Sequence, residues 1–279
     1  MINCDINCKF NNSIYIISIL NTKEGRMQII LSPAKKLCLE SKYDGKFTNP
    51  EFIFEASQIM SELRKETVKS ISEKMKVSKD IAEENYNRYK EWREEVADDY
   101  ICAGFLYDGA TFQGLDFNSF NVADIHYSQS HLTILSALYG VLRPLDAIMP
   151  YRLEMNQKNI VVDGKKNFYE FWKLKITNLL NFNLNEDKIL INLASDEYSK
   201  VIDKKIFKGN IITPIFKDNK NGVYKIISSY VKRARGSMAR FIITNRISDI
   251  EELKRFDYDG YKFDAFEGDS MIFKRDVRN

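Results

Sequence analysis

Cations gather in one segment of the sequence, Lys225–Arg246, and no acidic residue interrupts them. At helical spacing from Ser228 onward, the apolar side chains share one arc of about 100°. They are Val231, Ala234, Met238, Phe241 and Ile242. The remaining surface carries Lys232, Arg233, Arg235, Arg240 and Arg246, with Gly236 and Ala239 between them. We expect this surface to bind phosphates, because small residues let them approach the backbone. The alternative is an ordinary solvated amphipathic helix.

A lysine follows the first clear strand pattern of the chain. Residues 28–31 read as a short buried strand, and Ser32-Pro33-Ala34-Lys35 comes directly after it. Functional groups of α/β proteins often lie where strands end. Lys35 is therefore a candidate phosphate ligand, and the alternative is a solvated side chain beside Lys36.

The same order of strand and polar residues recurs in Asn192–Tyr198. Residues 188–194 read as a buried strand, and Ser195-Asp196-Glu197 follows. A nucleophilic Ser195 would need a base, and no histidine is expected nearby. We favour Ser195 as a helix cap, with the two carboxylates complementing the helix dipole. Adjacent helical positions point about 100° apart, so these carboxylates do not converge on one metal.

Two further arginines are candidates for anion binding. Leu138–Pro144 lies between two segments that we expect to be helical, with Gly140 at the turn. A helix-hairpin-helix aims backbone amides and a helix N-terminus at phosphate, and Arg143 suits such a contact. The usual hairpin has two glycines, so a plain helix–turn–helix connection is the alternative. In Pro150–Met155, Arg152 and Glu154 share one side of an extended chain. That spacing allows either an internal ion pair or a phosphate ligand.

Bulk composition places few limits on function. The 279 residues hold 42 Lys and Arg against 39 Asp and Glu, a net charge of only +3, so local clustering must carry any case for nucleic acid. The cysteines form no CxxC pair and fit a reducing cytoplasm. His126 and His131 lie five apart and read as ordinary helix residues. We therefore expect no zinc site. A carboxylate site for magnesium stays open but has no signature.

Hydrophobic periodicity predicts one mixed α/β domain. Helices are expected at 49–64, 78–92, 124–138 and 168–180, and in the basic segment from Ser228. Strands are expected at 28–31, 188–194, 211–216, 223–227 and 271–274. The strands at 211–216 and 223–227 would pair around the turn at 217–222. The glycine- and aromatic-rich segment 104–114 reads as strand and turn.

Residues 1–26 stand apart from this pattern. Ser13–Leu20 is an apolar run too short to span a bilayer, and no signal-peptide cleavage site follows it. Met27 opens a much clearer element, so we expect Met27 to be the natural initiator and residues 27–279 to form the domain. Residues before Met27 in the intact mass of native protein would contradict this expectation.

Five ordered motifs resemble the YaaA family of bacterial proteins. They are Ser32–Lys35, Leu135–Asp146, Pro150–Met155, Asn192–Tyr198 and Lys232–Phe241. The resemblance runs from Met27 to about Arg275, where Gly260-Tyr261-x-Phe263 and Phe273-Lys274-Arg275 also match, and residues 1–26 lie outside it. One departure is Gly109-Ala110-Thr111-Phe112, where family members often have Gly-Asp-Val-Tyr. Any role of that aspartate does not carry over to this chain.

The resemblance implies a cytoplasmic protein of peroxide-stress resistance. Such proteins limit oxidative damage to DNA and protein under hydrogen peroxide, partly by keeping unincorporated iron low. The implied fold is a single α/β domain with a central mixed sheet, surrounding helices and a positively charged cleft. A helix-hairpin-helix-like element and binding of double-stranded DNA are implied as well. Neither a cofactor nor a membrane is part of this picture.

These observations give a DNA-binding hypothesis and two alternatives. Phosphates of double-stranded or bubble-containing DNA would contact Lys35, Arg143, Arg152, Lys232, Arg233, Arg235 and Arg240. Shape and backbone contacts would dominate, since no base-reading module is recognised. The first alternative is an enzyme acting on phosphorylated DNA or a nucleotide, with Asp196 or Glu197 as its acid–base group. The second is direct iron binding by carboxylates, because soft ligands are scarce.

Overall fold

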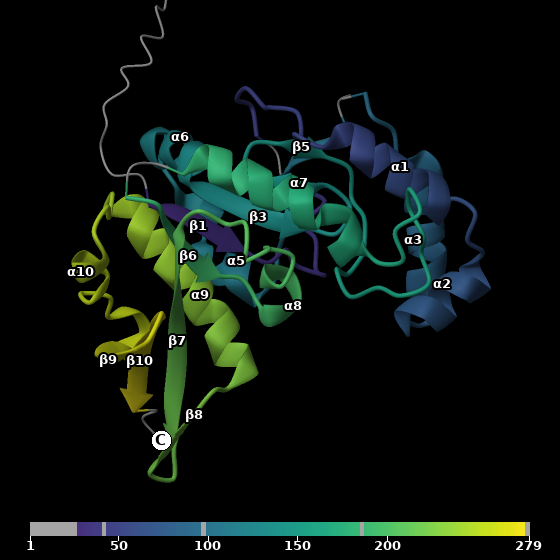
Figure 1. Cartoon of the computed structure of the whole chain (residues 1–279). Helices are drawn as coiled ribbons and strands as arrows, with labels where there is room; N and C mark the ends of the chain where they lie inside the picture. The colour runs from purple at the N-terminus through teal and green to yellow at the C-terminus, as the bar shows by residue number, and fades with distance from the viewer. Residues whose placement is uncertain (1–26, 41–42, 96–98, 185–186, 277–279) are drawn as a thin grey trace, which may run out of the picture.

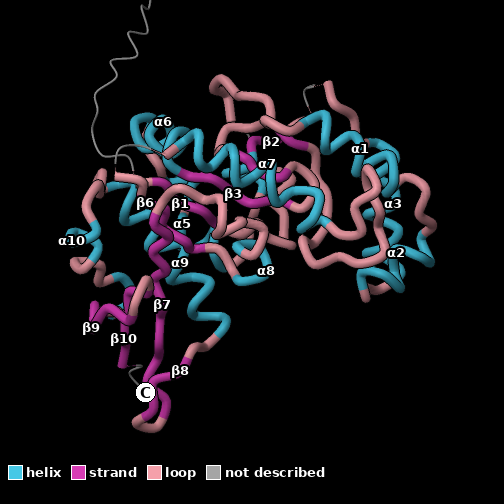
Figure 2. Tube along the Cα trace, viewed as in Figure 1, coloured by secondary structure: helices cyan, strands magenta, loops and turns pink. Residues whose placement is uncertain are grey.

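Parallel strands cross the middle of the molecule and helices lie on both sides of them (Figures 1 and 2). The structure is a computed structural model that describes residues 27–40, 43–95, 99–184 and 187–276. The strands are β1 Gln28–Leu31, β2 Ile101–Cys102, β3 Leu132–Ser136, β4 Gly140–Leu142, β5 Ala147–Ile148, β6 Ile189–Leu193, β7 Asn210–Lys220, β8 Val223–Lys225, β9 Lys262–Glu267 and β10 Ser270–Asp276. The α-helices are α1 Ile53–Leu63, α2 Val68–Met75, α3 Lys79–Glu91, α4 Ala103–Leu106, α5 Ala110–Leu115, α6 Val122–His131, α7 Phe168–Asn183, α8 Asp196–Ser199, α9 Ser228–Thr244 and α10 Ile250–Leu253. Short 3₁₀ turns lie at Phe117–Ser119 and Tyr258–Gly260.

The central sheet is mixed. Among the described residues it has eight strands in the order β4-β3-β1-β6-β7-β10-β9, with β8 paired to β7. The five inner strands β3, β1, β6, β7 and β10 are parallel, whereas β4, β8 and β9 pair antiparallel with their neighbours. The predicted α/β class and single domain with a mixed sheet are confirmed.

The candidate functional residues lie at the sheet edge that is formed by the carboxyl ends of the inner strands. β1 and β6 are buried runs of apolar side chains, as expected for parallel strands covered on both faces. Leu31 pairs with Leu193 on one side and with Ile134 on the other, so β1 and β6 end together and β3 continues two residues further, to Ser136. The chain leaves β1 toward β3 and later returns to β6 on the opposite side of β1. This reversal is a topological switch point, where α/β proteins commonly bind ligands.

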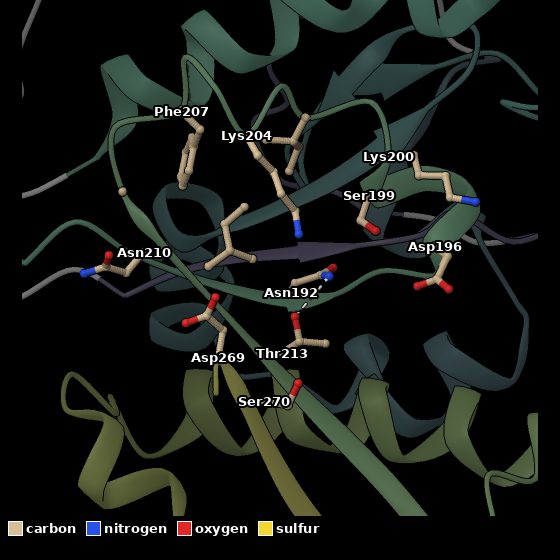
Figure 3. A pocket seen from close by; sticks show the side chains of 13 residues that line it. Asn192, Asp196, Ser199, Lys200, Lys204, Phe207, Asn210, Thr213, Asp269 and Ser270 are labelled. Carbon is tan, nitrogen blue, oxygen red and sulfur yellow. Dashed lines mark hydrogen bonds between the residues drawn. The ribbon is translucent and has the colours of Figure 1, made fainter. Parts of the chain in front are cut away.

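Helices cover the two faces of the sheet. α7 lies on one face, and α5 and α9 lie on the other (Figures 1 and 3). α1, α2 and α3 form a separate group at the end of the molecule away from β8 and β9 (Figure 1). None of the described helices has the length and apolar character needed to cross a bilayer.

The basic segment forms helix α9, as predicted, and its predicted apolar face is buried. Its small residues have a different role from the one expected. Gly236 and Ala239 are buried, and a Cβ added to Gly236 would lie 1.7 Å from the carbonyl oxygen of Thr111 in α5. Reciprocally, a Cβ added to Gly114 in α5 would lie 2.1 Å from the carbonyl oxygen of Arg233. The expectation that these small residues admit phosphates is wrong, because they admit helix α5.

Several other predicted elements are confirmed. Helix α3 lies within 78–92 and Ser78 caps it, since its hydroxyl accepts a hydrogen bond from the Ile81 amide. Helix α7 begins at Phe168 as expected and ends later, at Asn183. β1, β6 and β10 match their predicted strands closely. β7 and β8 pair as predicted, but β7 extends to Lys220 and the turn is only Asn221-Gly222.

Three predictions of secondary structure are wrong. The segment 104–114 forms helices α4 and α5, because its glycines permit close packing instead of turns. The predicted helix 124–138 ends at His131, where the fully buried strand β3 begins. A short apolar run of that kind fits a buried strand or a buried helix equally well. Finally, α1 begins at Ile53 instead of near Asn49-Pro50, and neither of those residues caps it. Residues 1–26 fall outside the described part of the chain, so their assignment stays a prediction.

Candidate functional site

Ser32 and Ser195 join the ends of β1 and β6 at the switch point. The backbone amide of Ser195 donates to the hydroxyl of Ser32 at 2.8 Å. The Ser32 hydroxyl in turn donates to the Ser195 hydroxyl at 3.2 Å. These bonds fix the two loops that carry the other polar groups of this edge.

Ser195 stands at the N-cap position of α8, as predicted, but it does not cap the helix through its side chain. Among the described residues its hydroxyl meets Ser32 instead of a first-turn amide. Asp196 and Glu197 do open the helix, where carboxylates favour the positive end of the dipole.

Lys35 and Arg152 meet at one carboxylate. The Lys35 ammonium lies 2.6 Å from Glu154 Oε1, and an Arg152 Nη2 lies 3.9 Å from the same oxygen. The expected pair between Arg152 and Glu154 is therefore present, and it extends to the loop after β1. Lys35 keeps 60% of its side chain exposed. It can contact an anion without leaving the carboxylate.

Glu197 is the most perturbed carboxyl at this edge. Partial burial raises its pKa above the ordinary glutamate value, and the neighbouring Glu154 carboxylate acts in the same direction. The Asn156 amide donates to Glu197 Oε1 at 3.4 Å, and this bond together with Lys35 opposes the rise. A carboxyl with a raised pKa is suited to proton transfer at higher pH than an exposed glutamate.

Two arginines at this edge have donors without a partner. The Nε atoms of Arg152 and Arg235 are buried and meet no acceptor among the described residues. Burial lowers the pKa of the Arg235 guanidinium, and the Asp196 carboxylate at the start of α8 favours its charged form. A buried guanidinium with an unmet N–H is poised to bind an added acceptor such as a phosphate oxygen.

Lys232 and Arg233 lie three and two residues before Arg235 on α9 and are exposed. Arg233 makes a long ion pair of 3.4 Å with Asp259, and 58% of its side chain remains accessible. Lys232 makes no ion pair within the described part of the chain. These two cations therefore remain available to a polyanion.

Arg240 has a different position, toward the other end of α9. One of its Nη atoms donates to the carbonyls of Leu115 and Asp116 and to the Ser119 hydroxyl, at 2.7–3.1 Å. Its guanidinium also lies 5.1 Å from the centre of the Phe120 ring. It thereby satisfies carbonyls at the C-terminus of α5, so its position is that of a structural residue.

Arg143 does not join the cations at the switch point. β4 runs antiparallel to β3, with Leu142 opposite Ile134, so the chain at Arg143 heads toward the amino end of β3. The Arg143 guanidinium is held by the buried Asp146 carboxylate at 3.0 Å and by the Asn49 carbonyl at 3.1 Å. The expected helices on both sides of Leu138–Pro144 are wrong, because β3 and β4 form a β-hairpin there.

A helical hairpin does exist elsewhere in the chain. α2 and α3 pack together and are joined by residues 76–78. Lys76 adopts a left-handed conformation with φ of 53°, and Ser78 caps α3. Sequence inspection predicted α3 but missed α2, because a lysine occupies the left-handed turn position where glycine is usual.

Three buried hydroxyls form a hydrogen-bonded chain that no sequence pattern predicted. Tyr107 and Tyr151 share a hydrogen bond of 2.8 Å, and Tyr151 meets Ser136 at 2.5 Å. Ser136 accepts from the Tyr139 amide at 2.9 Å, which fixes the turn after β3. Burial raises the pKa of Tyr151 to about 12, so it stays protonated at neutral pH.

Comparisons with known proteins add to this geometry. A sequence model described as peroxide stress protein YaaA matches residues 27–267. This chain belongs to the YaaA family. A UPF0246 protein of Aliivibrio fischeri (strain ATCC 700601 / ES114) is 45% identical over 260 residues, covering 91% of this chain and all of that protein. A UPF0246 protein of Ralstonia pickettii (strain 12J) is 46% identical over 255 residues, covering 89% of this chain and 99% of that protein.

Membership of the YaaA family supports a role in peroxide stress. It also confirms the family resemblance drawn from the five motifs. Among the described residues, no group of three or more His, Cys, Asp and Glu side chains is arranged to hold a metal ion. The YaaA-family motifs Ser32–Lys35, Pro150–Met155 and Asn192–Tyr198 meet at the carboxyl edge of the sheet.

Proposed function

We propose that the protein binds duplex DNA along the first half of α9 and the adjoining carboxyl edge of the sheet during peroxide stress. The observation that carries the proposal is the pair Lys232 and Arg233, which are exposed in the first half of α9. Arg235 adds a guanidinium whose Nε has no partner among the described residues. Lys35 and Arg152, which share Glu154 as a counter-ion at the switch point, would extend the positive region.

The geometry favours contacts to phosphates over contacts to bases. The cations lie on a helix that is packed against α5 through glycine, so α9 is not free to enter a major groove along its full length. Phosphate contacts are independent of sequence and release counterions. Binding would therefore be of low sequence specificity and strongly dependent on salt. Arg143 and Arg240 would stabilise the fold without contacting DNA, since Arg143 forms an ion pair with Asp146 and Arg240 donates to the Leu115 carbonyl.

Equilibrium binding to labelled DNA in a salt series tests this proposal. Fluorescence anisotropy with duplex and bubble-containing DNA should show that affinity falls as salt concentration rises. For duplex, the slope of the logarithm of the binding constant against the logarithm of the salt concentration should be about −0.9 per neutralised phosphate. A flat salt dependence, or no binding at low salt, would refute it. A preference for the bubble would identify opened DNA as the target.

Protection of DNA and proteins and a lower level of unincorporated iron are part of the same proposal. This part is supported by membership of the peroxide stress protein YaaA family, and cytoplasmic location is proposed on the same ground. Whole-cell electron paramagnetic resonance of chelatable iron tests it, in cells that lack the protein and in cells that carry Lys232→Ala/Arg233→Ala. Equal iron levels with and without the protein would remove the iron function.

A second candidate function is an enzyme that acts on a phosphorylated substrate. It is favoured by one observation, the raised pKa of the Glu197 carboxyl beside the ion pair of Lys35 with Glu154. Lys35 and Arg152 would hold the phosphate and Glu197 would transfer a proton. Turnover of a nucleotide or DNA substrate that is lost in Glu197→Gln, with DNA binding intact, would favour this candidate over simple binding.

A further inference from the structure

A pocket opens where β7 changes its partner in the sheet. β7 pairs with β6 through Ile212, and from Thr213 onward it pairs with β10. The gap between β6 and β10 is lined from the sheet by Asn192, Thr213, Asp269 and Ser270. Residues of α8 and of the loop after it close the other sides, and the pocket volume is about 810 Å3. That volume lies within the range of roughly 300–1,000 Å3 found for small-molecule sites.

The pocket adjoins the switch point, since Asn192 of β6 and Asp196 of α8 both line it. Asp196 belongs to both places, because it lines the pocket and interacts electrostatically with Arg235. Figure 3 shows Asp196 and Ser199 at one end of the pocket and Phe207 and Asn210 at the other. The Lys204 ammonium projects between these ends toward Asn192.

The floor of the pocket offers polar groups with unused hydrogen-bonding capacity. Asn192 is 8% exposed; its Oδ1 accepts from the Ala194 amide at 3.1 Å and its Nδ2 donates to Thr213 at 3.4 Å. A side-chain amide has two donors and two acceptor sites, so one donor and one acceptor site of Asn192 remain for a ligand. The Asp269 carboxylate adds an acceptor at the end of the floor.

The walls suit a flat, apolar face. The Phe207 ring and the side chains of Ile202 and Ile211 line the pocket beside the polar floor. An aromatic ring next to hydrogen-bonding groups is the usual arrangement for holding a nucleobase, which has an apolar face and a polar edge. Carboxylates accept hydrogen bonds and do not donate them, so the two aspartates favour a base that carries an amino group. Lys204 supplies a cation for a phosphate.

We infer that this pocket binds one nucleotide whose base carries an amino group, namely adenine, guanine or cytosine. The nucleotide is either free or an unpaired nucleotide of DNA. The second source rests on the proposed DNA binding, whereas the first is independent of it. Asn192, Thr213 and Asp269 contact the edge of the base, Phe207 packs against its face, and Lys204 binds its phosphate.

Isothermal titration calorimetry of the full chain with the four deoxynucleoside monophosphates tests whether the pocket binds a free nucleotide. Binding of an unpaired nucleotide of DNA is tested with 2-aminopurine, a base that carries an amino group, placed in the bubble of a DNA duplex. We expect binding at or below about 1 mM with dAMP, dGMP or dCMP and weaker binding with dTMP, or quenching of 2-aminopurine fluorescence in the bubble. Thr213→Val and Asp269→Asn should each weaken the binding about tenfold. In Lys204→Ala, a nucleotide should bind no more tightly than the corresponding nucleoside.

Lys205→Ala is the matched control, since Lys205 is an exposed neighbour of Lys204 that does not line the pocket. It should behave as the wild type in both assays. Anisotropy with fully paired duplex separates this inference from the proposed function. Pocket variants should keep duplex binding, and Lys232→Ala/Arg233→Ala should weaken it while keeping free-nucleotide binding. The inference is overturned by an absence of binding in both assays, or by binding that Thr213→Val and Asp269→Asn leave unchanged.

Discussion

The Glu154 carboxylate lies 2.6 Å from the Lys35 ammonium and so neutralises part of the positive region at the switch point. It also lies 3.9 Å from Arg152, which makes it a shared counter-ion for two candidate phosphate ligands. A phosphate that binds here must compete with this carboxylate. Glu154 therefore limits the affinity of this edge for anions.

Removing that counter-ion should strengthen DNA binding. Glu154→Gln should raise duplex affinity about two- to fivefold at low salt, because a partly exposed ion pair contributes about 1 kcal/mol or less. Anisotropy titrations measure the change. Glu62→Gln is the control, because Glu62 at the end of α1 forms an ion pair with Lys65, just beyond the helix. Equal affinity of Glu154→Gln and wild type would remove Lys35 and Arg152 from the DNA site.

Arg240 should matter for stability more than for binding. Arg240→Ala leaves the Leu115 and Asp116 carbonyls without their donor, and we expect the free energy of unfolding to fall by about 1–2 kcal/mol. Urea denaturation measures this value. Lys232→Ala on the same helix should unfold as the wild type does. An unchanged midpoint for Arg240→Ala would contradict the structural role assigned to Arg240.

Gly236 should not tolerate a side chain. Its added Cβ would meet the Thr111 carbonyl at 1.7 Å, so Gly236→Ala must push α9 away from α5. We expect the free energy of unfolding to fall by about 2–3 kcal/mol. Ser229→Ala, at an exposed position of the same helix, controls for helix propensity. Thermal unfolding of the two variants gives the comparison, and equal melting temperatures would be inconsistent with the close crossing.

The buried hydroxyl chain predicts a cost for deleting one phenol oxygen. Tyr151→Phe removes the partner of both Tyr107 and Ser136, so we expect a loss of about 2 kcal/mol in the free energy of unfolding. Tyr230→Phe, at an exposed tyrosine of α9, should have no such effect. Denaturant titrations of both variants test the prediction, and equal stability would show that water replaces the lost partner.

Glu197 predicts a dependence of stability on pH. Its folded pKa is raised, so the folded state holds this proton more tightly than the unfolded state does. The corresponding stability is present at low pH and is lost as pH rises through the folded pKa. Glu197→Gln is neutral at every pH and keeps an oxygen for the Asn156 amide. It should therefore be more stable than wild type at pH 7, and the difference should vanish toward pH 4. A difference independent of pH would contradict the raised pKa.

Sequence patterns located the elements whose signal lies within a single segment. α9 was predictable because its apolar face and its cations alternate at helical spacing, and β1 and β6 because they are short apolar runs bounded by polar residues. α5 was not predictable, since Gly114 makes sense only when α9 lies against it. β3 was mistaken for helix because a fully buried strand has no alternation to reveal it.

Some residues of the candidate site could likewise be predicted from the sequence, whereas the roles of others could not. Lys35, Arg152 and Ser195 were found because they follow strands or lie in family motifs, and the structure places them at one edge. The roles of Arg143 and Arg240 could not be inferred, because both depend on acceptors that only the fold brings near. Asn49 lies 94 positions from Arg143, and Leu115 lies 125 positions from Arg240.

The most direct test of DNA binding by α9 is the salt dependence of duplex affinity for Lys232→Ala/Arg233→Ala. Lys254→Ala/Arg255→Ala is the matched control, since it removes the same two residue types at the C-terminal end of α10. The α9 variant should bind duplex DNA more weakly whatever the DNA sequence. The steepness of its plot of log binding constant against log salt concentration should fall by about 1.8, corresponding to two lost phosphate contacts. The control should keep the wild-type slope. Equal slopes for the α9 variant and the wild type would contradict the assignment of α9 as the DNA-binding surface.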